Sequence, residues 1–228
     1  MNKKLLSLAL VAGALYSAPA LAGDGNGHLS VGVTGGTLGI GPEVGYRVNE
    51  TIGIRANATF LSVSHDISSD DIDYDGKVKL KSGGVMLDVY PFGGGFRISG
   101  GARINKNKAR GIGQPTGGTF DINGQSYDAS TLVTSVRADT DIKDFAPALT
   151  VGYGGGTSSG FVFGIEAGAL FQGSVKIKPL TITGQCATTP TLCPGLAADL
   201  DAERQSVNDD IDDYKVYPIL QLTVGYRF

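Results

Sequence analysis

The stretch DDIDYDG, which ends at Gly76, carries the residue spacing of a calcium-binding loop. Asp71, Asp73 and Asp75 alternate as the first ligands of an EF-hand loop do, and Gly76 stands where that loop turns sharply. An EF-hand also needs a bidentate glutamate at position twelve, and here that position is Ser82. Half of the ligand set is missing, so we expect a solvated acidic turn. The three aspartates remain only a weak candidate metal site.

A second group of reactive side chains precedes this stretch: Ser62, Ser64, His65 and Asp66. A serine, a histidine and a carboxylate could assemble a hydrolase that acts on lipids. Neighbours in an extended strand point to alternate faces, however, and no second segment suggests an oxyanion hole. The sequence favours a serine-rich turn at a strand end. It predicts a protein that is not an enzyme and has no cofactor, with a lipid-modifying enzyme as the lesser alternative.

The beginning of the sequence has the pattern of a secretory signal peptide. Two lysines precede an apolar run from Leu5 to Leu15, and an A-x-A cleavage site ends at Ala22. The apolar run is too short for a membrane-spanning helix. We therefore expect a signal peptide over residues 1–22 and one mature domain over residues 23–228.

Charge and cysteine content narrow the class of protein further. The formal net charge of −3 gives no sign of a nucleic-acid partner. Cys186 and Cys193 are the only cysteines, and in an oxidising compartment we expect them to pair as a disulfide. A metal site is the rival interpretation, but the only histidines, His28 and His65, are far away in the sequence.

Apolar residues alternate with small or polar ones along the mature chain, which is typical of strands with lipid on one face. In TIGIRANATFL, for example, Ile52, Ile54 and Phe60 share one face, while Gly53 and Arg55 lie on the other. We predict an all-β fold, a transmembrane antiparallel up-and-down β-barrel of about eight strands. The expected strands are 28–34, 37–48, 51–61, 77–90, 96–105, 145–153, 161–177 and 218–228.

The alternation changes phase at two glycine pairs. At Gly83-Gly84 a β-bulge would absorb the change. At Gly35-Gly36 the change leaves two possibilities open, a hairpin or one long kinked strand over residues 28–48.

The last segment, PILQLTVGYRF, places Leu220, Leu222, Val224, Tyr226 and Phe228 on one face. It resembles the closing strand of small outer-membrane β-barrels of Gram-negative bacteria, typified by the OmpA membrane domain and OmpW. The resemblance implies an outer-membrane location. It also implies that the barrel-assembly machinery reads Tyr226 and Phe228 as an insertion signal. An OmpW-like relative would be a porin-like narrow channel for small molecules.

The connections between the expected strands alternate between short and long, as they do between the periplasmic and outer ends of such barrels. Residues 66–76, 109–141 and 178–215 are the long outer loops. They could carry an extracellular partner, and residues 195–214 have the spacing of an amphipathic helix that caps the barrel or meets that partner. Aromatic residues near the short turns would form one interfacial girdle: Tyr46, Tyr90, Phe92, Phe96, Tyr153, Phe161, Tyr226 and Phe228.

Charged residues fall on the inward-facing positions of the expected strands. An eight-stranded barrel is just wide enough for its interior to be filled by side chains, so a hydrogen-bonded ion network would plug it. A narrow polar conduit is the alternative. The lumen network comprises Glu43, Arg47, Arg55, Asp88, Arg97, Arg103, Glu166 and Arg227.

Three cations, Lys106, Lys108 and Arg110, continue the lipid-facing side of their strand beyond its apolar part. Charges on that face are tolerated only near the membrane interface. There they could contact the phosphates of lipopolysaccharide, or they could form a solvated rim. The expected partners are therefore outer-membrane lipid and lipopolysaccharide. The non-enzymatic role would be structural or in surface interaction.

Overall fold

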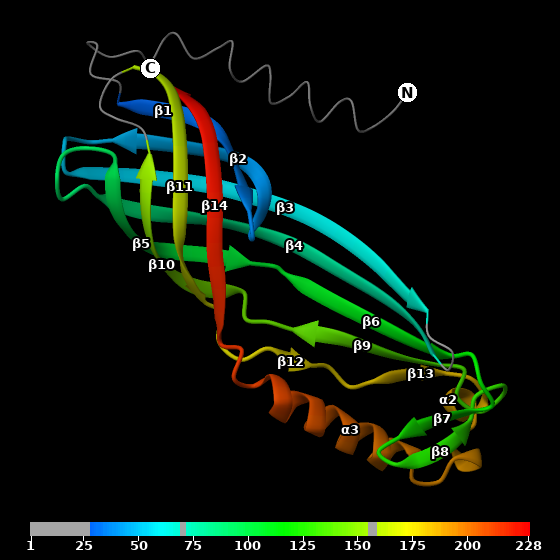
Figure 1. Cartoon of the computed structure of the whole chain (residues 1–228). Helices are drawn as coiled ribbons and strands as arrows, with labels where there is room; N and C mark the ends of the chain where they lie inside the picture. The colour runs from blue at the N-terminus through cyan, green and yellow to red at the C-terminus, as the bar shows by residue number, and fades with distance from the viewer. Residues whose placement is uncertain (1–27, 69–71, 155–158) are drawn as a thin grey trace, which may run out of the picture.

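Eight antiparallel strands close into a barrel (Figure 1). The computed structural model describes residues 28–68, 72–154 and 159–228, so the expected signal peptide lies outside the described residues. The barrel strands, in their order around the ring, are β1 (Leu29–Gly36), β2 (Gly39–Arg47), β3 (Ile52–Ser68), β4 (Ile72–Val89), β5 (Phe96–Asn105), β10 (Phe145–Gly154), β11 (Gly160–Phe171) and β14 (Val216–Arg227).

Pairing between β14 and β1 closes the ring, from Ser30 opposite Arg227 to Gly36 opposite Gln221. The predicted barrel of eight strands is confirmed. At its start, residues 28–48 form the hairpin β1–β2, in which Gly36 pairs with Gly39 across a two-residue turn.

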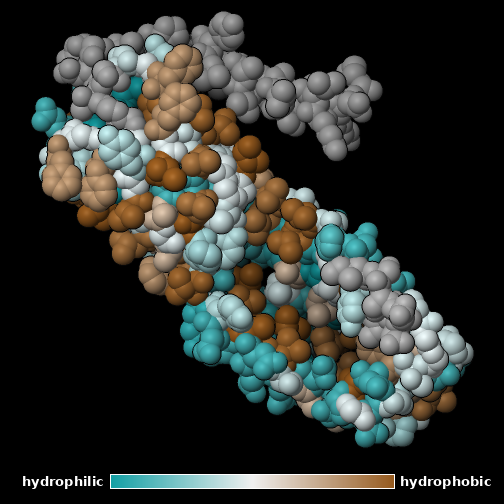
Figure 2. All heavy atoms as spheres, viewed as in Figure 1, coloured by the Kyte–Doolittle hydropathy of each residue, from teal (hydrophilic) through white to brown (hydrophobic). Residues whose placement is uncertain are grey.

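Large apolar side chains cover the outside of the barrel. Side chains along a strand point alternately outward and inward, so the apolar positions of each strand face outward and the small or polar ones face inward. Ile54, Phe163 and Leu222 are at least 47% exposed, although each belongs to a strand in the middle of the sheet. On the face seen in Figure 2, hydrophobic side chains gather over the barrel, while hydrophilic ones dominate the other end of the molecule.

The barrel continues at one end into an open outer sheet, because β3 and β4 are nearly twice as long as their neighbours. Beyond the barrel, β4 pairs with β6 (Lys108–Pro115), which pairs with β9 (Ser135–Asp141). Two short strands, β12 (Lys176–Ile177) and β13 (Thr181–Thr183), also pair with β9. We define β6, β9, β12, β13 and the outer halves of β3 and β4 as the outer sheet.

Two sequence predictions in this region are wrong. The segment 66–76 is not a long loop, because Ile72 to Gly76 are extended in β4 and pair with β6, and Asp73 to Gly76 also pair with β3. No bulge occurs at Gly83-Gly84, where the register with β3 runs without interruption. The apolar positions of β4 change side for another reason. Within the barrel its apolar residues face outward, but beyond the barrel Val78 and Leu80 lie on the inner side of the outer sheet.

The other long connections also contain regular structure. A hairpin around Asn123-Gly124 consists of β7 (Thr119–Ile122) and β8 (Gln125–Asp128), and both turn residues have positive φ, as a type I′ turn requires. The strand expected over 161–177 ends at Phe171, and Lys176–Ile177 belongs to the outer sheet instead. The remaining elements are α2 (Gln185–Thr188), the 3₁₀ helix η2 (Pro190–Leu192) and α3 (Leu196–Ile211).

These elements form a second small core at the far end of the outer sheet. Ile122, Val133 and Leu196 are buried there beside the predicted disulfide Cys186–Cys193, whose Cα atoms lie 5.7 Å apart. We call this cluster the outer core. No helix within the described ranges is both long and apolar enough to cross a membrane.

A tyrosine joins the hairpin to the helix at the edge of the outer core. The hydroxyl group of Tyr127 donates a hydrogen bond to Asp199 on α3. Burial and this hydrogen bond raise the pKa of Tyr127 to about 12. Asn123 Nδ2 also donates to Asp199, at 3.2 Å, so one carboxylate fixes the hairpin against α3.

The outer core should depend on the disulfide, while the barrel should not. Replacing Cys186 and Cys193 by serine removes the closure of a short loop. We expect this to destabilise the outer core by about 2.5 kcal/mol. Hydrogen exchange would then accelerate at the amides of Ile122 and Val133 and stay slow at Thr150 in the barrel. Equal acceleration at both places would contradict two separately held cores.

Candidate functional site

Inward-facing positions on six barrel strands bring charged side chains together inside the barrel. Strand alternation directs these residues into the lumen, between neighbours that face outward. The structure places all eight charged residues of the expected lumen network there. None is more than 7% exposed: Glu43 and Arg47 on β2, Arg55 on β3, Asp88 on β4, Arg97 and Arg103 on β5, Glu166 on β11 and Arg227 on β14.

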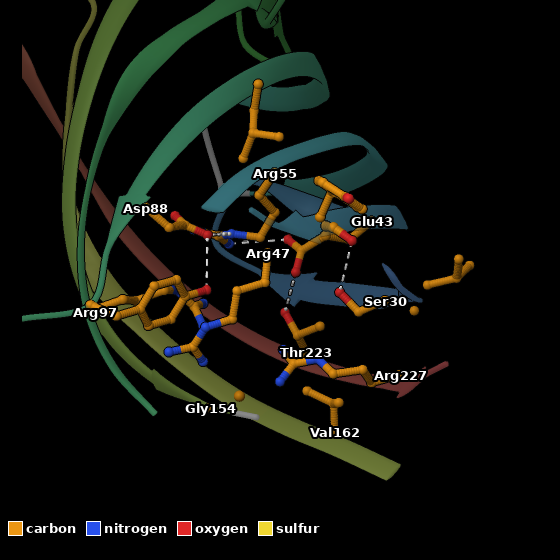
Figure 3. Close-up of a pocket in the computed structure, with 18 residues that line it drawn as sticks. Ser30, Glu43, Arg47, Arg55, Asp88, Arg97, Gly154, Val162, Thr223 and Arg227 are labelled. Carbon is orange, nitrogen blue, oxygen red and sulfur yellow. Dashed lines mark hydrogen bonds and ion pairs between the residues drawn. The ribbon is translucent and has the colours of Figure 1, made fainter. Parts of the chain in front are cut away.

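The guanidinium group of Arg55 is the centre of this network (Figure 3). Its Nε and Nη2 atoms donate to the two carboxylate oxygens of Asp88, at 3.0 and 3.1 Å. Nη1 donates to Glu43 Oε2 at 3.3 Å, and Nη2 also donates to Glu166 Oε2. One cation therefore joins carboxylates from three other strands of the barrel.

Further side chains complete the hydrogen bonds of these carboxylates. Asn57 Nδ2 donates to Glu43 Oε2 at 3.0 Å, and Thr223 Oγ1 donates to Glu43 Oε1 at 3.3 Å. Arg97 Nη2 donates to Glu166 Oε2 at 3.1 Å. The pattern of charged residues alone does not identify Asn57 and Thr223, which are uncharged. Their inward-facing positions would have identified them.

Arg103 is buried nearby but has a different environment. Its Nη1 donates to Asn57 Oδ1 at 2.6 Å, and its Nη2 donates to Ser82 Oγ at 2.9 Å and to Thr59 Oγ1 at 3.4 Å. Within the part of the chain that the structure describes, Arg103 makes no ion pair. Amide and hydroxyl oxygens, rather than carboxylates, hold this cation.

Arg47 is also held without a carboxylate, at the end of the barrel that carries the short turns. Its Nη1 and Nη2 donate to the carbonyl oxygens of Gly94 and Gly93, at 3.2 and 2.8 Å. Its guanidinium carbon lies 3.9 Å from the centre of the Tyr90 ring, a cation–π contact. Tyr90 is 6% exposed, so its placement in the aromatic girdle is wrong. Its hydroxyl group lies 3.5 Å from Asp88 inside the lumen.

The other aromatic residues of the expected girdle include two contacting groups at this end. Phe161 meets Tyr226 edge-on, with ring centroids 5.7 Å apart, and Tyr226 meets Phe228 at 5.2 Å. Phe92 and Phe96 lie 5.8 Å apart beside another short turn. The proposed insertion residues Tyr226 and Phe228 thus belong to one aromatic group.

An apolar cluster occupies the lumen on the side of the outer sheet. It contains Met86, Leu170 and Ile219 from three strands, together with Leu38 from the turn between β1 and β2. Leu38 falls within the strand expected over 37–48, but it lies in the turn and is 3% exposed because that turn folds it inward. Side chains therefore fill the lumen in layers: the Arg55 network towards the short turns, this apolar cluster further along, and the polar group of Arg103, Ser82 and Thr59 on the side of the outer sheet.

The candidate hydrolase residues do not assemble into a catalytic site. Ser62, Ser64 and Asp66 alternate with His65 along β3, so the histidine points to the opposite face of the strand. The side chains of Ser62, Ser64, His65 and Asp66 are all exposed. We find no geometry here in which the imidazole could accept a proton from either serine.

Two of the three candidate metal residues lie in an extended strand. Asp71 lies outside the described residues, while Asp73 and Asp75 belong to β4 and pair with β3 and β6. Asp75 accepts a hydrogen bond from Gln114 Nε2 at 3.4 Å. Elsewhere in the described segments, no three His, Cys, Asp or Glu side chains are grouped as metal ligands.

The cations expected at the membrane interface form a ladder between β4 and β6. Lys77 lies directly opposite Arg110, and Lys79 lies opposite Lys108. The next position brings Lys106 beside Lys81, through a backbone hydrogen bond of 2.8 Å. All six side chains are exposed, and they lie on the same side of the sheet as the lipid-facing residues of β4. We call these six residues the cation ladder.

Two aspartates compensate only part of this charge. Arg110 Nε donates to Asp139 Oδ1 at 2.7 Å, and Lys106 pairs with Asp144. Hydrogen bonds from Arg110 and Arg137 hold the pKa of Asp139 below its ordinary value. Among the described residues, the other four cations of the ladder have no ion-pair partner.

Comparisons with known proteins support the fold alone. No protein-family model and no curated protein matches the chain. Two solved structures are similar, both from Acinetobacter baumannii. CarO2 has a TM-score of 0.57 at 19% identity, over 88% of this chain and 98% of that one. CarO has a TM-score of 0.56 at 18% identity, over 87% and 97%. The likeness supports the barrel class, but does not single out the OmpA or OmpW type.

Glu166 should matter for stability more than for permeation. The variant Glu166→Gln removes the charge that pairs with both Arg55 and Arg97, so buried Arg97 loses the one ion pair it makes among the described residues and Arg55 loses one of three. We expect the free energy of unfolding in lipid vesicles to fall by about 3 kcal/mol, with planar-bilayer conductance unchanged.

The variant Lys215→Gln is the matched control for Glu166→Gln, since it breaks the solvent-exposed ion pair with Asp212. We expect no measurable change in the free energy of unfolding for this control. A large gain in conductance with unchanged stability in Glu166→Gln would contradict a structural role of the lumen network.

Proposed function

We propose that this chain is an integral outer-membrane β-barrel with a plugged lumen and a structural or surface-interaction role. One observation carries the proposal: charged side chains are buried inside the barrel, while large apolar ones are exposed around it. A water-soluble protein has the opposite arrangement, and an apolar surface of this extent requires lipid or a partner to cover it. The CarO-like barrel fold agrees with this reading.

The layers of side chains in the lumen support a plug. Arg55 and its carboxylates cross the barrel at one level, and Met86, Leu170 and Ile219 pack together at another. A solute would have to separate both layers, and an eight-stranded barrel has little spare width. A narrow OmpW-like channel is the second candidate. A cavity of about 40 Å³ beside Arg47, Arg97 and Arg227 supports this channel, but it lies only at one end of the lumen.

The cation ladder supports a contact with lipopolysaccharide. Like charges directly opposite each other on paired strands are destabilising, so uncompensated pairs such as Lys79 and Lys108 favour an external anion. They lie just beyond the apolar part of the barrel, at the level that lipid phosphates would occupy in the proposed orientation. Phosphate groups would then neutralise the ladder.

The outer sheet and the outer core offer a surface for an extracellular partner. The disulfide holds this region, and α3 lies along it (Figure 1). Leu196 at the start of α3 is buried in the outer core, so the helix is part of this surface rather than a free arm. This surface could bind a partner without any enzymatic centre.

The membrane assignment predicts two properties of the purified protein. The folded barrel should migrate differently in a gel before and after heating, because closed barrels resist detergent until they are heated. In planar bilayers it should show no steady conductance steps, because the lumen layers remain closed. Steady conductance would favour the channel. The absence of a heat-dependent shift would contradict the membrane barrel itself.

The cation ladder can be tested by charge removal. Replacing Lys106, Lys108 and Arg110 by glutamine should reduce the lipopolysaccharide that co-purifies with the folded protein several-fold. Replacing Lys176, Lys178 and Lys215 by glutamine removes equal charge outside the ladder and should leave it unchanged. Equal amounts of lipopolysaccharide in both variants would refute the contact.

A further inference from the structure

Four arginines line one small cavity at the end of the lumen that carries the short turns, Arg55 of the lumen network among them, and Glu43 and Asp88 line it too (Figure 3). Arg47 comes from β2, Arg97 from β5 and Arg227 from β14, and all three line the cavity. Arg47 and Arg97 are close enough to Arg227 to repel it electrostatically. Ser30 and Thr223 also line the cavity, but their hydroxyl groups already donate to Gly45 O and to Glu43 Oε1.

The hydrogen bonds of these arginines are incomplete to different degrees. Arg47 has carbonyl acceptors for Nε and for both terminal nitrogens. Arg97 uses Nη2 for Glu166, while its buried Nε has no partner. Arg227 is 5% exposed, and neither its Nε nor its Nη1 has a hydrogen-bond partner among the described residues.

The nearby carboxylates are already engaged. Asp88 accepts two hydrogen bonds from Arg55, and Glu43 accepts from Arg55, Asn57 and Thr223. Glu166 is shared between Arg55 and Arg97. None of these three carboxylates pairs with Arg227, so the four arginines that line the cavity outnumber them and positive charge is in excess there. A buried charge without compensation is strongly unfavourable.

We propose that this cavity binds one small inorganic anion, held chiefly by Arg227 and Arg97. Its volume of about 40 Å³ is several times the roughly 10 to 15 Å³ needed to hold one water molecule, so a chloride-sized ion fits. The unpartnered nitrogen atoms would donate charge-assisted hydrogen bonds to the anion. This site goes beyond the proposed structural role, because it couples the stability of the barrel to the anions of its surroundings.

Anion exchange at constant ionic strength tests the proposal. The refolded wild-type protein in lipid vesicles is unfolded with urea in sodium gluconate, which is too bulky for the cavity, and then in sodium chloride or sodium phosphate. The unfolding equilibrium constant should fall about tenfold when the small anion reaches ten times its dissociation constant. The two arms show whether chloride or inorganic phosphate is the better ligand. Stabilisation by neither one overturns the site.

Arg227→Gln should abolish the anion effect. Arg103→Gln is the matched control, because it also removes a buried lumen arginine but one that does not line the cavity. The control should keep the full chloride response. An undiminished response in Arg227→Gln would overturn the proposal.

A measurement on the wild-type protein covers the case in which Arg227→Gln does not fold. The ³⁵Cl resonance should broaden in the presence of the folded protein and recover its width after heat unfolding. Broadening that persists after unfolding, or no broadening together with no stabilisation by phosphate, would exclude a specific site.

Discussion

The ion pairs of Arg55 are the interaction on which the rest of the barrel interior depends. This guanidinium group reaches Asp88, Glu43 and Glu166, which stand on three different strands. Desolvation makes each of these charges costly when it is alone, so the network is stable only as a set. Asn57, Thr223 and Arg97 donate further hydrogen bonds to the same carboxylates. The lumen is therefore filled by a structure that fixes strand positions as well as charge.

The membrane and the lumen constrain the same strands from opposite sides. A shift of β3 by one residue would move Arg55 into lipid and Ile54 into the network, so each face enforces the register of the other. Closure between β1 and β14 satisfies the backbone groups that hydrocarbon could not. Among the described strands, unpaired edges occur beyond the cation ladder, in the outer sheet and in the β7–β8 hairpin. That is also where the disulfide and the outer core supply additional stability.

The sequence predicted the eight barrel strands because lipid on one face and charge on the other make alternation strong. The predictions were wrong beyond the barrel, where the strands no longer separate lipid from a charged lumen. Asp73 and Gly76 favour a turn, yet pairing with β6 holds them in a strand. This pairing joins residues far apart in the chain; Asp75 and Gln114, for example, are 39 residues apart. A local sequence pattern cannot predict such a partner. Tyr90 is an aromatic residue beside a short turn, as girdle residues are, but its ring packs against Arg47 inside the barrel. Long-range contacts, rather than propensity, decided these cases.

The most direct test compares two buried arginines of the lumen, Arg55 and Arg103, each replaced by methionine. The free energy of unfolding in lipid vesicles should fall by about 3 to 5 kcal/mol for Arg55→Met, because three carboxylates lose their common cation. Arg103 is held only by neutral oxygens, so Arg103→Met should cost about 1 to 2 kcal/mol. Equal losses, or a larger loss for Arg103→Met, would contradict a barrel interior organised around Arg55.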